Sequence, residues 1–362
     1  KHKTNFMKPH TQNLCAYLYC FFRSTACIAF LVFFLVSCRK NDFTTIDDEQ
    51  AQEQDGKISA RRTETATGPN IILILADDIG FEIPTANGGN TYETPNIDLM
   101  AQNGMLFTQC HAAPLCSPSR VMLLTGKYNF RNYTRWGLLD RTNKTVVNML
   151  HDSGYKTLLT GKWQLDGGDT SITTFGFDDY LVWAPFTPYG SSENSGKGSR
   201  YKSPTLYQNA GYIPQTETNN LYSEDLFTNK IKDFIDSNLT TPFFVYYPMC
   251  IGHFPFLPTP DDAEYLQWST SNNASNKQFF PSMVKYMDKK VGEIVTKVQD
   301  AGIAENTIII FMGDNGTNKD ITSYLNNKKY KGGKRTPKES GTRVPLIVYW
   351  PATVAVDIVN DD

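Results

Sequence analysis

The amino-acid sequence predicts an α/β fold, a doubly wound and mostly parallel sheet flanked by helices. Short runs that are almost entirely apolar are typical of strands buried on both faces. Here they alternate with segments whose apolar residues recur every three or four positions, the spacing of an amphipathic helix. The composition agrees, because 362 residues with 40% hydrophobic and 20% charged residues describe a globular chain, not a disordered, collagenous or coiled-coil one.

The N-terminal region is expected to be an export signal and a tether. The apolar run 26–36 is short for a membrane span and suits a signal peptide. It leads into the letters LVSC, ending at Cys38, which resemble a bacterial lipobox, where cleavage precedes a cysteine that then receives lipid. We predict a lipoprotein-type signal peptide over residues 1–37, with a generic signal peptide or single anchor helix as the alternative. The polar residues 38–68 would then be a flexible tether.

Residues 69–362 are predicted to form one catalytic domain, exported to the periplasm or to the outer-membrane surface of a Gram-negative bacterium. Its strands are expected at the apolar runs 70–76, 155–160, 242–249, 307–312 and 345–350. Its longer helices are expected between them, at 96–103, 145–152, 223–235 and 279–299. The stretch 183–220, rich in Tyr, Ser, Gly and Asn, breaks this alternation and is predicted to be a long loop or lid.

Polar side chains follow four of the predicted strands, at the points where the strands end. Because the carboxyl ends of parallel strands meet at one edge, where ligands bind, these side chains should lie close together. Each pattern by itself is typical of a turn or a helix cap, so the prediction of a site depends on their convergence. The residues concerned are Asp77, Asp78, Lys162, Gln164, His253, Asp314 and Asn315.

The acidic residues of this group predict a metal site. Three carboxylates and the amide oxygen of Asn315 form an all-oxygen ligand set, which favours Ca²⁺ or Mg²⁺ over Zn²⁺. The net charge of −2 provides no basic field for a nucleic acid, so we expect no nucleic-acid partner.

The segment from Cys116 to Arg120 predicts a short helix that begins just after Cys116. Ser117 suits the N-cap, Pro118 suits the first helical position, and Gly126 suits the end. The free N–H groups at the start of a helix attract an anion. Arg120, one turn further on, would hold that anion or fix the position of Cys116.

Together these motifs resemble the type I, formylglycine-dependent sulfatases of the alkaline phosphatase superfamily. The resemblance covers roughly residues 69–350 and depends on the CxPSRxxLLTG pattern at 116–126, with GKW at 161–163, GDNG at 313–316 and GK at 333–334. It implies that a formylglycine-generating or radical maturation enzyme oxidises Cys116 to formylglycine, whose hydrate is the nucleophile. Without the other motifs, Cys116 would be read as an ordinary buried cysteine beside a helix.

The resemblance also implies a role for each candidate. The modified Cys116 would bind Ca²⁺, with Mg²⁺ as the less favoured ion, together with Asp77, Asp78, Asp314 and Asn315. Arg120 would stabilise the formylglycine hydrate. Lys162 and Lys334 would hold the sulfate oxygens, and His253 would assist departure of the alcohol. These cations suit a sulfate ester, whose charge lies on its non-bridging oxygens.

The chain departs from the family pattern at Gln164, where the family usually has a histidine thought to take a proton as sulfate is expelled. A glutamine can hydrogen-bond there but cannot accept that proton. We hypothesise that His111 or a carboxylate at the metal replaces it. We favour the simpler interpretation that His111 is structural, and His151 lies on a predicted helix and is a poor substitute.

Two further departures concern the end of the sequence. The motif at 339–345 has Ser340 where the family usually has glycine, which we attribute to the local backbone. Family members usually continue through another helix and a small C-terminal subdomain, so we expect this sequence, which ends at Asp362, to be truncated.

The leading hypothesis is hydrolysis of a sulfate ester, with a sulfated polysaccharide or oligosaccharide as the substrate. Four aromatic residues of the predicted loop would either stack on sugar rings or pack inside the protein: Trp183, Tyr189, Tyr201 and Tyr207. The alternatives are a phosphodiesterase or phosphonate monoester hydrolase of the same superfamily, and a catalytically impaired glycan-binding relic on the cell surface.

Overall fold

The computed structural model describes residues 67–165, 168–183, 199–209, 211–268 and 275–362. The predicted signal peptide, the lipid-anchor residue Cys38, the tether up to residue 66 and Tyr189 lie outside these residues, so the predicted domain boundaries stay predictions. Within the described ranges, no helix combines the length and apolar character that crossing a bilayer requires.

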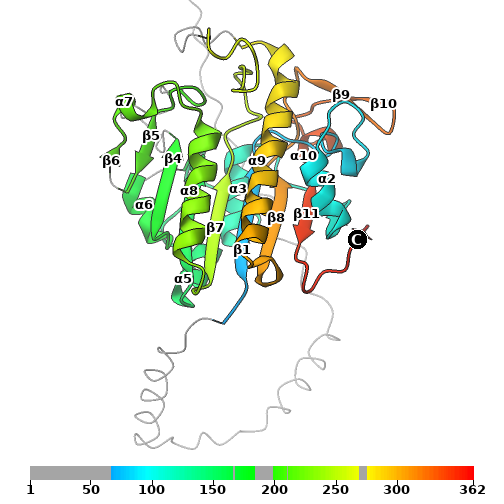
Figure 1. Ribbon diagram of the computed structural model, residues 1–362. Coiled ribbons are helices and arrows are strands. Elements are labelled where there is room, and N and C mark those ends of the chain that lie inside the picture. Colours follow the sequence, from blue (N-terminus) through cyan, green and yellow to red (C-terminus); the bar gives the residue numbers. More distant parts are fainter. Residues whose placement is uncertain (1–66, 166–167, 184–198, 210, 269–274) are drawn as a thin grey trace, which may run out of the picture. The chain divides into compact units, whose positions relative to one another are not determined.

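A ten-stranded mixed sheet forms the centre of the fold, in the order β12-β2-β11-β8-β1-β7-β3-β4-β5-β6 (Figure 1). Its five middle strands are parallel, which confirms the predicted doubly wound, mostly parallel class. In spatial order they are β8 (Thr307–Gly313), β1 (Asn70–Ala76), β7 (Phe243–Pro248), β3 (Lys156–Gly161) and β4 (Asp179–Trp183).

The outer strands are mostly antiparallel. Strand β11 (Leu346–Tyr349) runs antiparallel to β8 and to β2 (Met105–Phe107), and β12 (Ile358–Asn360) pairs with β2. The run 345–350 is therefore a strand as predicted, but it does not belong to the parallel part of the sheet. The chain leaves β8 at the carboxyl edge and re-enters there without a crossover helix, so the next strand must run in the opposite direction.

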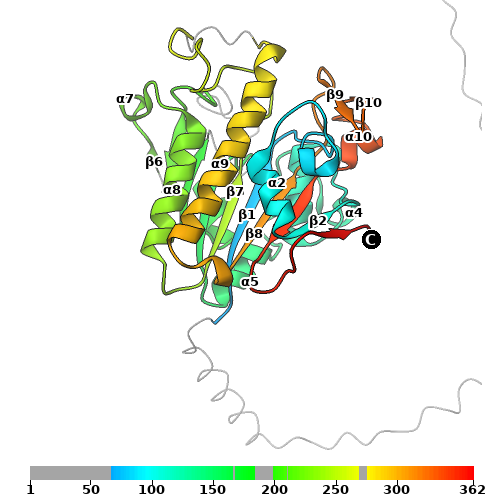
Figure 2. The same ribbon diagram turned by 45° about the vertical axis from the view of Figure 1, so that its right-hand side comes forward.

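Helices cover both faces of the sheet (Figures 1 and 2). Ile72 and Ile74 of β1 pack in the cluster that contains apolar residues of α2, α8 and α9, whereas Leu73 and Leu75 pack with those of α3, α5 and α6. This is the alternation of side chains along a strand that is buried on both faces. The helices on the first face are α2 (Pro95–Gln102), α8 (Ser223–Ser237) and α9 (Phe280–Asp300). Those on the second are α3 (Cys116–Thr125), α5 (Val146–Asp152) and α6 (Gly168–Thr174).

Short elements complete the fold. A separate antiparallel hairpin, β9 (Thr322–Leu325) and β10 (Lys328–Lys331), stands above the carboxyl edge of the sheet (Figure 2). The short helices are η2 (Thr85–Asn87), α4 (Asn129–Asn132), α7 (Gln215–Thr218), η3 (Lys277–Phe279), η4 (Ala304–Asn306) and α10 (Glu339–Thr342).

The stretch predicted as a long loop is partly regular. It contains the end of β4, then β5 (Leu206–Gln208), β6 (Gly211–Tyr212) and α7, while residues 184–198 lie outside the described part of the chain. Trp183, Tyr201 and Tyr207 are all buried. They therefore pack inside the protein and do not offer their rings to a sugar.

Candidate active site

Four adjacent strands bring the predicted polar residues to one edge of the sheet. Asp77 and Asp78 follow β1, Asp314 follows β8, His253 comes shortly after β7, and Lys162 follows β3. Since these strands are neighbours in the order β8-β1-β7-β3, their carboxyl ends converge (Figure 1).

The carboxylates of this edge are fully buried, and each is paired with a cation. Asp77 Oδ2 lies 2.6 Å from Lys162 Nζ. Asp314 Oδ2 accepts a 2.8 Å bond from Arg120 Nη2, and Asp78 Oδ1 lies 2.5 Å from Lys334 Nζ. Pairing of this kind is what a buried charge requires, because an isolated one is strongly disfavoured in a protein interior.

Three buried oxygens of the cluster have no hydrogen-bond partner: Asp77 Oδ1, Asp78 Oδ2 and Asn315 Oδ1. An unsatisfied buried polar atom costs about 1–3 kcal/mol, so a missing partner is implied. The possible ligand atoms of Asp77, Cys116 and Asp314 lie within 4.8 Å of one another. A hard divalent cation fits this oxygen-rich set, which agrees with the calcium expectation.

The backbone at this edge adopts unusual conformations. Asp78 has a φ of 60°, and its N–H donates to Asp314 Oδ1 at 3.1 Å. Gly252, beside His253, has a φ of 103°, and a Cβ there would lie 2.4 Å from the carbonyl oxygen of Asp77. Only glycine meets both conditions, so the His253 loop can lie directly against the Asp77 backbone.

Cys116 stands at the first position of α3, with Leu115 as the N-cap. The predicted start is therefore wrong by about two residues. The hydroxyl of Ser117 does not cap the helix because it accepts a 2.9 Å bond from the N–H of Gly137. Pro118 is tolerated at the third position, where its missing N–H would have had no helical acceptor. The helix ends at Gly126, with a φ of 64°, as predicted.

The thiol of Cys116 is buried and donates a 3.3 Å hydrogen bond to Gln164 Oε1. Burial raises the pKa of this thiol. Gln164 reaches it from a backbone with a φ of 53°. The residue that departs from the family pattern is thus in direct contact with the candidate nucleophile.

Arg120 ties three elements of the site together. Its Nη2 bonds Asp314 at the end of β8, and its Nη1 donates a 2.7 Å bond to the carbonyl of Lys162 after β3. Because Arg120 lies on α3, these two bonds also fix the helix that carries Cys116. The guanidinium is 1% exposed, so it is committed to the site and not to solvent.

The two adjacent aspartates have opposite pKa shifts. Burial favours a raised pKa for Asp77, but the positive charges around it, led by Lys162, outweigh this and hold its pKa well below the usual range. Burial and the negative charge of Asp77 raise the pKa of Asp78 to about 6, against the opposing effect of Lys334.

His253 lies at the rim of the cluster. Its Nε2 is 3.9 Å from Asp78 Oδ2, and its Nδ1 is 2.5 Å from the carbonyl oxygen of Phe254. Burial and the positive charge of Arg200 lower the pKa of His253 well below its usual range, so the ring is neutral at pH 7. The carbonyl of Phe254 then holds the proton on Nδ1, and Nε2 faces the site as an acceptor.

Sequence reasoning missed the groups that hold the His253 loop. Glu224 of α8 is fully buried, and its Oε1 accepts 2.9 Å bonds from the N–H groups of Cys250 and Ile251. The hydroxyl of Tyr201 lies 3.0 Å from the carbonyl of Cys250 and 2.5 Å from that of His253. The partners of Glu224 are backbone groups far along the chain, so no spacing pattern marked this residue.

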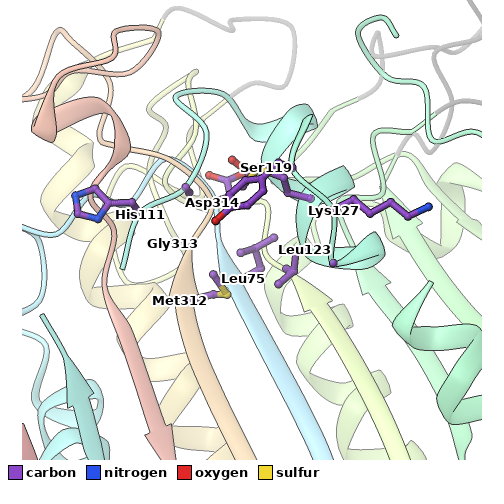
Figure 3. Close-up of a pocket in the computed structure, with 12 residues that line it drawn as sticks. Leu75, His111, Ser119, Leu123, Lys127, Met312, Gly313 and Asp314 are labelled. Atoms are coloured by element: carbon purple, nitrogen blue, oxygen red, sulfur yellow. The ribbon is translucent and has the colours of Figure 1, made fainter. Parts of the chain in front are cut away.

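His111 and His151, the two histidines weighed as replacements for the family histidine at position 164, contact acidic residues outside the cluster. His111 is exposed, with Nε2 3.3 Å from Glu339 Oε1 and Nδ1 3.0 Å from the carbonyl of Gln109. Figure 3 shows its ring directed away from Asp314. His151 lies on α5 and its Nε2 is 3.2 Å from Asp178 Oδ1. Both arrangements suit structural roles.

Two cavities border the cluster. One, of about 340 Å³, lies between α3 and the sheet and is lined mainly by apolar side chains such as Leu75, Leu123 and Met312 (Figure 3). An anionic ester would gain little from that lining. The other, of about 230 Å³, is lined by His253, Lys334 and further charged residues, and it is the better entrance for an anion.

Comparisons with known proteins agree with this geometry. The model of the sulfatase family matches residues 69–360. Arylsulfatase G of Rattus norvegicus is 30% identical over 82% of this chain and 62% of its own length. N-acetylgalactosamine-6-sulfatase of Mus musculus is 30% identical over 81% of this chain and 59% of its own length. This chain thus spans less than two thirds of either relative.

A solved structure shares the fold. The crystal structure of Ps i-CgsB in complex with k-i-k-neocarrahexaose matches with a TM-score of 0.68 and 25% identity, over 82% of this chain and 68% of that one. The family match extends over the strands, α3 and every residue of the buried cluster. The chain therefore belongs to the sulfatase family of the alkaline phosphatase superfamily.

Proposed function

We propose that the protein hydrolyses a sulfate ester of a sulfated oligosaccharide or polysaccharide, using a formylglycine made from Cys116 and a bound Ca²⁺. The observation that carries the proposal is the position of Cys116. It begins a helix, and its sulfur lies within 4.8 Å of carboxylate oxygens of both Asp77 and Asp314. A nucleophile made from this residue would sit beside the proposed metal.

Formylglycine and Ca²⁺ would supply the reactive centre. When present, the formylglycine hydrate supplies the nucleophile and Ca²⁺ supplies electrostatic stabilisation of the sulfate oxygens. The unpartnered oxygens of Asp77, Asp78 and Asn315 would hold the metal, together with Asp314. Arg120 would fix Asp314 and the start of α3 at the same time.

The lysines would bind the sulfate group. Lys162 and Lys334 are anchored by Asp77 and Asp78, so their ammonium groups are held in place before the substrate arrives. Preorganised charges of this kind stabilise a transition state without the cost of reorienting solvent.

His253 would protonate the departing alcohol. Its Nε2 faces the cluster while Nδ1 is held by the Phe254 carbonyl. The negative charge of an incoming sulfate ester would favour the imidazolium form, whose Nε2–H can donate to the leaving oxygen.

Gln164 would hold the nucleophile through its amide oxygen, as it now holds the Cys116 thiol. Because an amide cannot accept the proton of the sulfate-releasing step, another group must do so. His111 is engaged by Glu339, so a carboxylate at the metal is the better of the two substitutes.

The substrate class is supported by relatives. Ps i-CgsB was crystallised with a neocarrahexaose, and two similar proteins are named as N-acetylgalactosamine-6-sulfatases or -6-O-sulfatases. A maturation enzyme would be an obligatory partner because an unmodified thiol lacks the hydrate chemistry. Export as a lipoprotein anchored at Cys38 would place the protein where extracellular polysaccharides are degraded.

Mass spectrometry and a sulfate-release assay test the proposal. Protein from a host with the maturation machinery should show the Cys116 peptide about 18 Da lighter, the change from thiol to aldehyde. It should release sulfate from sulfated oligosaccharides, and a Cys116→Ala variant should not. A lighter peptide with faster turnover of phosphate esters than sulfate esters would support the phosphoesterase alternative, and an unmodified thiol without turnover would support the relic.

A further inference from the structure

Two exposed cationic side chains, Lys319 and Arg335, line the mouth of the proposed sulfate site, and neither has an ion-pair partner within the described part of the chain. We propose that Lys319 and Arg335 form a second anion-binding site, which takes a sulfate or carboxylate on another position of the same glycan substrate. This inference builds on the proposed function by adding that the preferred substrate carries at least two anionic groups.

The two residues share a cavity with the reaction centre. Lys319, Arg335, His253 and Lys334 all line the same hollow of about 230 Å³. Lys319 precedes β9 in the chain and Arg335 follows β10. Figure 2 shows the β9–β10 hairpin above the carboxyl edge of the sheet. A substrate with its sulfate ester at Lys334 would extend past both side chains.

The charges of this cavity are not balanced. Lys334 is neutralised by Asp78, at 2.5 Å. Among the residues that the structure describes, no ion pair involves Lys319 or Arg335, and both are exposed. The lining contains one further carboxylate, that of Asp320. Two free cations against one carboxylate leave a net positive charge, and a guanidinium can bind a sulfate or carboxylate through two parallel hydrogen bonds.

The backbone of Arg335 supports a use for its side chain. It has a φ of 72°, a left-handed conformation in which glycine is at ease and arginine is strained. The fold imposes this conformation, since the Arg335 N–H donates a 2.9 Å bond to the carbonyl of Pro114, two residues before Cys116. Strain at a residue whose side chain reaches a site entrance is typical of a functional position.

Arg335→Gly separates the effect of the strained backbone on stability from the effect of the guanidinium charge on binding. The variant should raise the melting temperature, because the backbone strain is relieved. Calorimetric titration in a Cys116→Ala background should show at least about tenfold weaker binding of a disulfated disaccharide. Binding of a disaccharide whose only charged group is one sulfate should not change. A monosulfated disaccharide that contains a uronic acid distinguishes a carboxylate from a sulfate as the second anion.

Three matched variants complete the test. Lys319→Ala should weaken binding of the disulfated ligand without raising the melting temperature, and Asp320→Asn should strengthen it. Lys338 is an exposed lysine outside the lining of this cavity, so Lys338→Ala should change neither the binding of the disulfated ligand nor the melting temperature. Equal losses for mono- and dianionic ligands, or none for either, would overturn the second anion site. Selective binding by these variants, combined with no sulfate release by the matured protein that retains Cys116, would retain the second anion site and reject the proposed hydrolysis.

Discussion

Lys162 and Asp77 form a fully buried ion pair, with Nζ 2.6 Å from Oδ2, although their strands are not neighbours in the sheet. Asp77 follows β1 and Lys162 follows β3, and β7 lies between these strands. The pair therefore spans the carboxyl end of β7, whose following loop carries His253. It joins the proposed metal side of the site to the proposed sulfate side.

Removal of one member of this pair should strongly destabilise the protein. Lys162→Met leaves Asp77 buried without its nearest cation, and breaking a buried pair in this way costs about 3–5 kcal/mol. Urea unfolding in the presence of EDTA measures the loss. Lys289→Met, which breaks the exposed pair with Asp261, should cost about 1 kcal/mol or less. Adding Asp77→Asn to Lys162→Met should recover part of the stability; no recovery would mean that lost packing, not charge, is the cause.

Calcium should stabilise the folded protein. The unpartnered oxygens of Asp77, Asp78 and Asn315 gain a partner when the ion binds. Linkage then adds about 2.7 kcal/mol at a calcium concentration of one hundred times Kd, visible as a rise in melting temperature. Asn315→Ala should reduce this rise, and Mg²⁺ should produce a smaller one.

The control for the calcium experiment is Asp261→Asn, which removes an exposed carboxylate that is paired with Lys289. Its melting temperature should respond to calcium as the wild type does. If all three proteins respond equally, the ion binds outside the proposed cluster.

Stability should fall as pH rises from about 4.5 to about 7 because of Glu82. This side chain is fully buried, neither of its carboxylate oxygens has a partner, and burial raises its pKa from 4.5 to about 7. The folded state thus holds a proton that the unfolded state releases above pH 4.5. The protonated Glu82 contributes fully to the free energy of unfolding below pH 4.5. This contribution is lost as pH rises to about 7, which lowers the free energy of unfolding by about 3 kcal/mol.

Glu82→Gln removes this titration. The variant should be more stable than the wild type at pH 8.5, and the difference should shrink as the pH is lowered to 4. Glu264→Gln, at an exposed position, serves as the control and should show no such dependence. Unfolding free energies of the three proteins across this range provide the measurement, and parallel curves would exclude Glu82 as the source.

Gly252→Ala should impair the proposed sulfate hydrolysis by displacing His253. A methyl group there would meet the Asp77 carbonyl at 2.4 Å, and the φ of 103° disfavours any side chain. We expect turnover to fall by about a hundredfold, as small displacements of reacting groups can do. Gly302→Ala is the matched control because Gly302 also has a positive φ, of 70°, with nothing within 4 Å of the added Cβ. A similar loss in both variants would assign the effect to general destabilisation.

The parallel part of the fold was predictable because its signals are local. Each strand is a continuous apolar run, and the parallel arrangement places the residues after it at one edge, so Asp77, Lys162 and Asp314 were expected to meet. The start of α3 was misplaced because Leu115 caps the helix and Ser117 bonds a distant backbone group, Gly137. Similar long-range contacts concealed the position of Glu224, which accepts bonds from backbone N–H groups of Cys250 and Ile251. They also concealed the left-handed backbone of Arg335, whose N–H bonds the carbonyl of Pro114.

Gln164→His tests whether the missing imidazole limits turnover. The position tolerates the change, because histidine is more frequent than most residues at a positive φ such as the 53° found here. The amide oxygen now lies 3.3 Å from Cys116 Sγ, so an imidazole at this position would lie beside the nucleophile made from that residue. If release of sulfate is slow in the wild type for want of a base, the variant should have a higher kcat that rises with pH through the titration of the new histidine. His111→Ala should leave kcat unchanged, since its ring is engaged by Glu339 at the surface. A loss of kcat in His111→Ala, with no gain in Gln164→His, would instead make His111 the base.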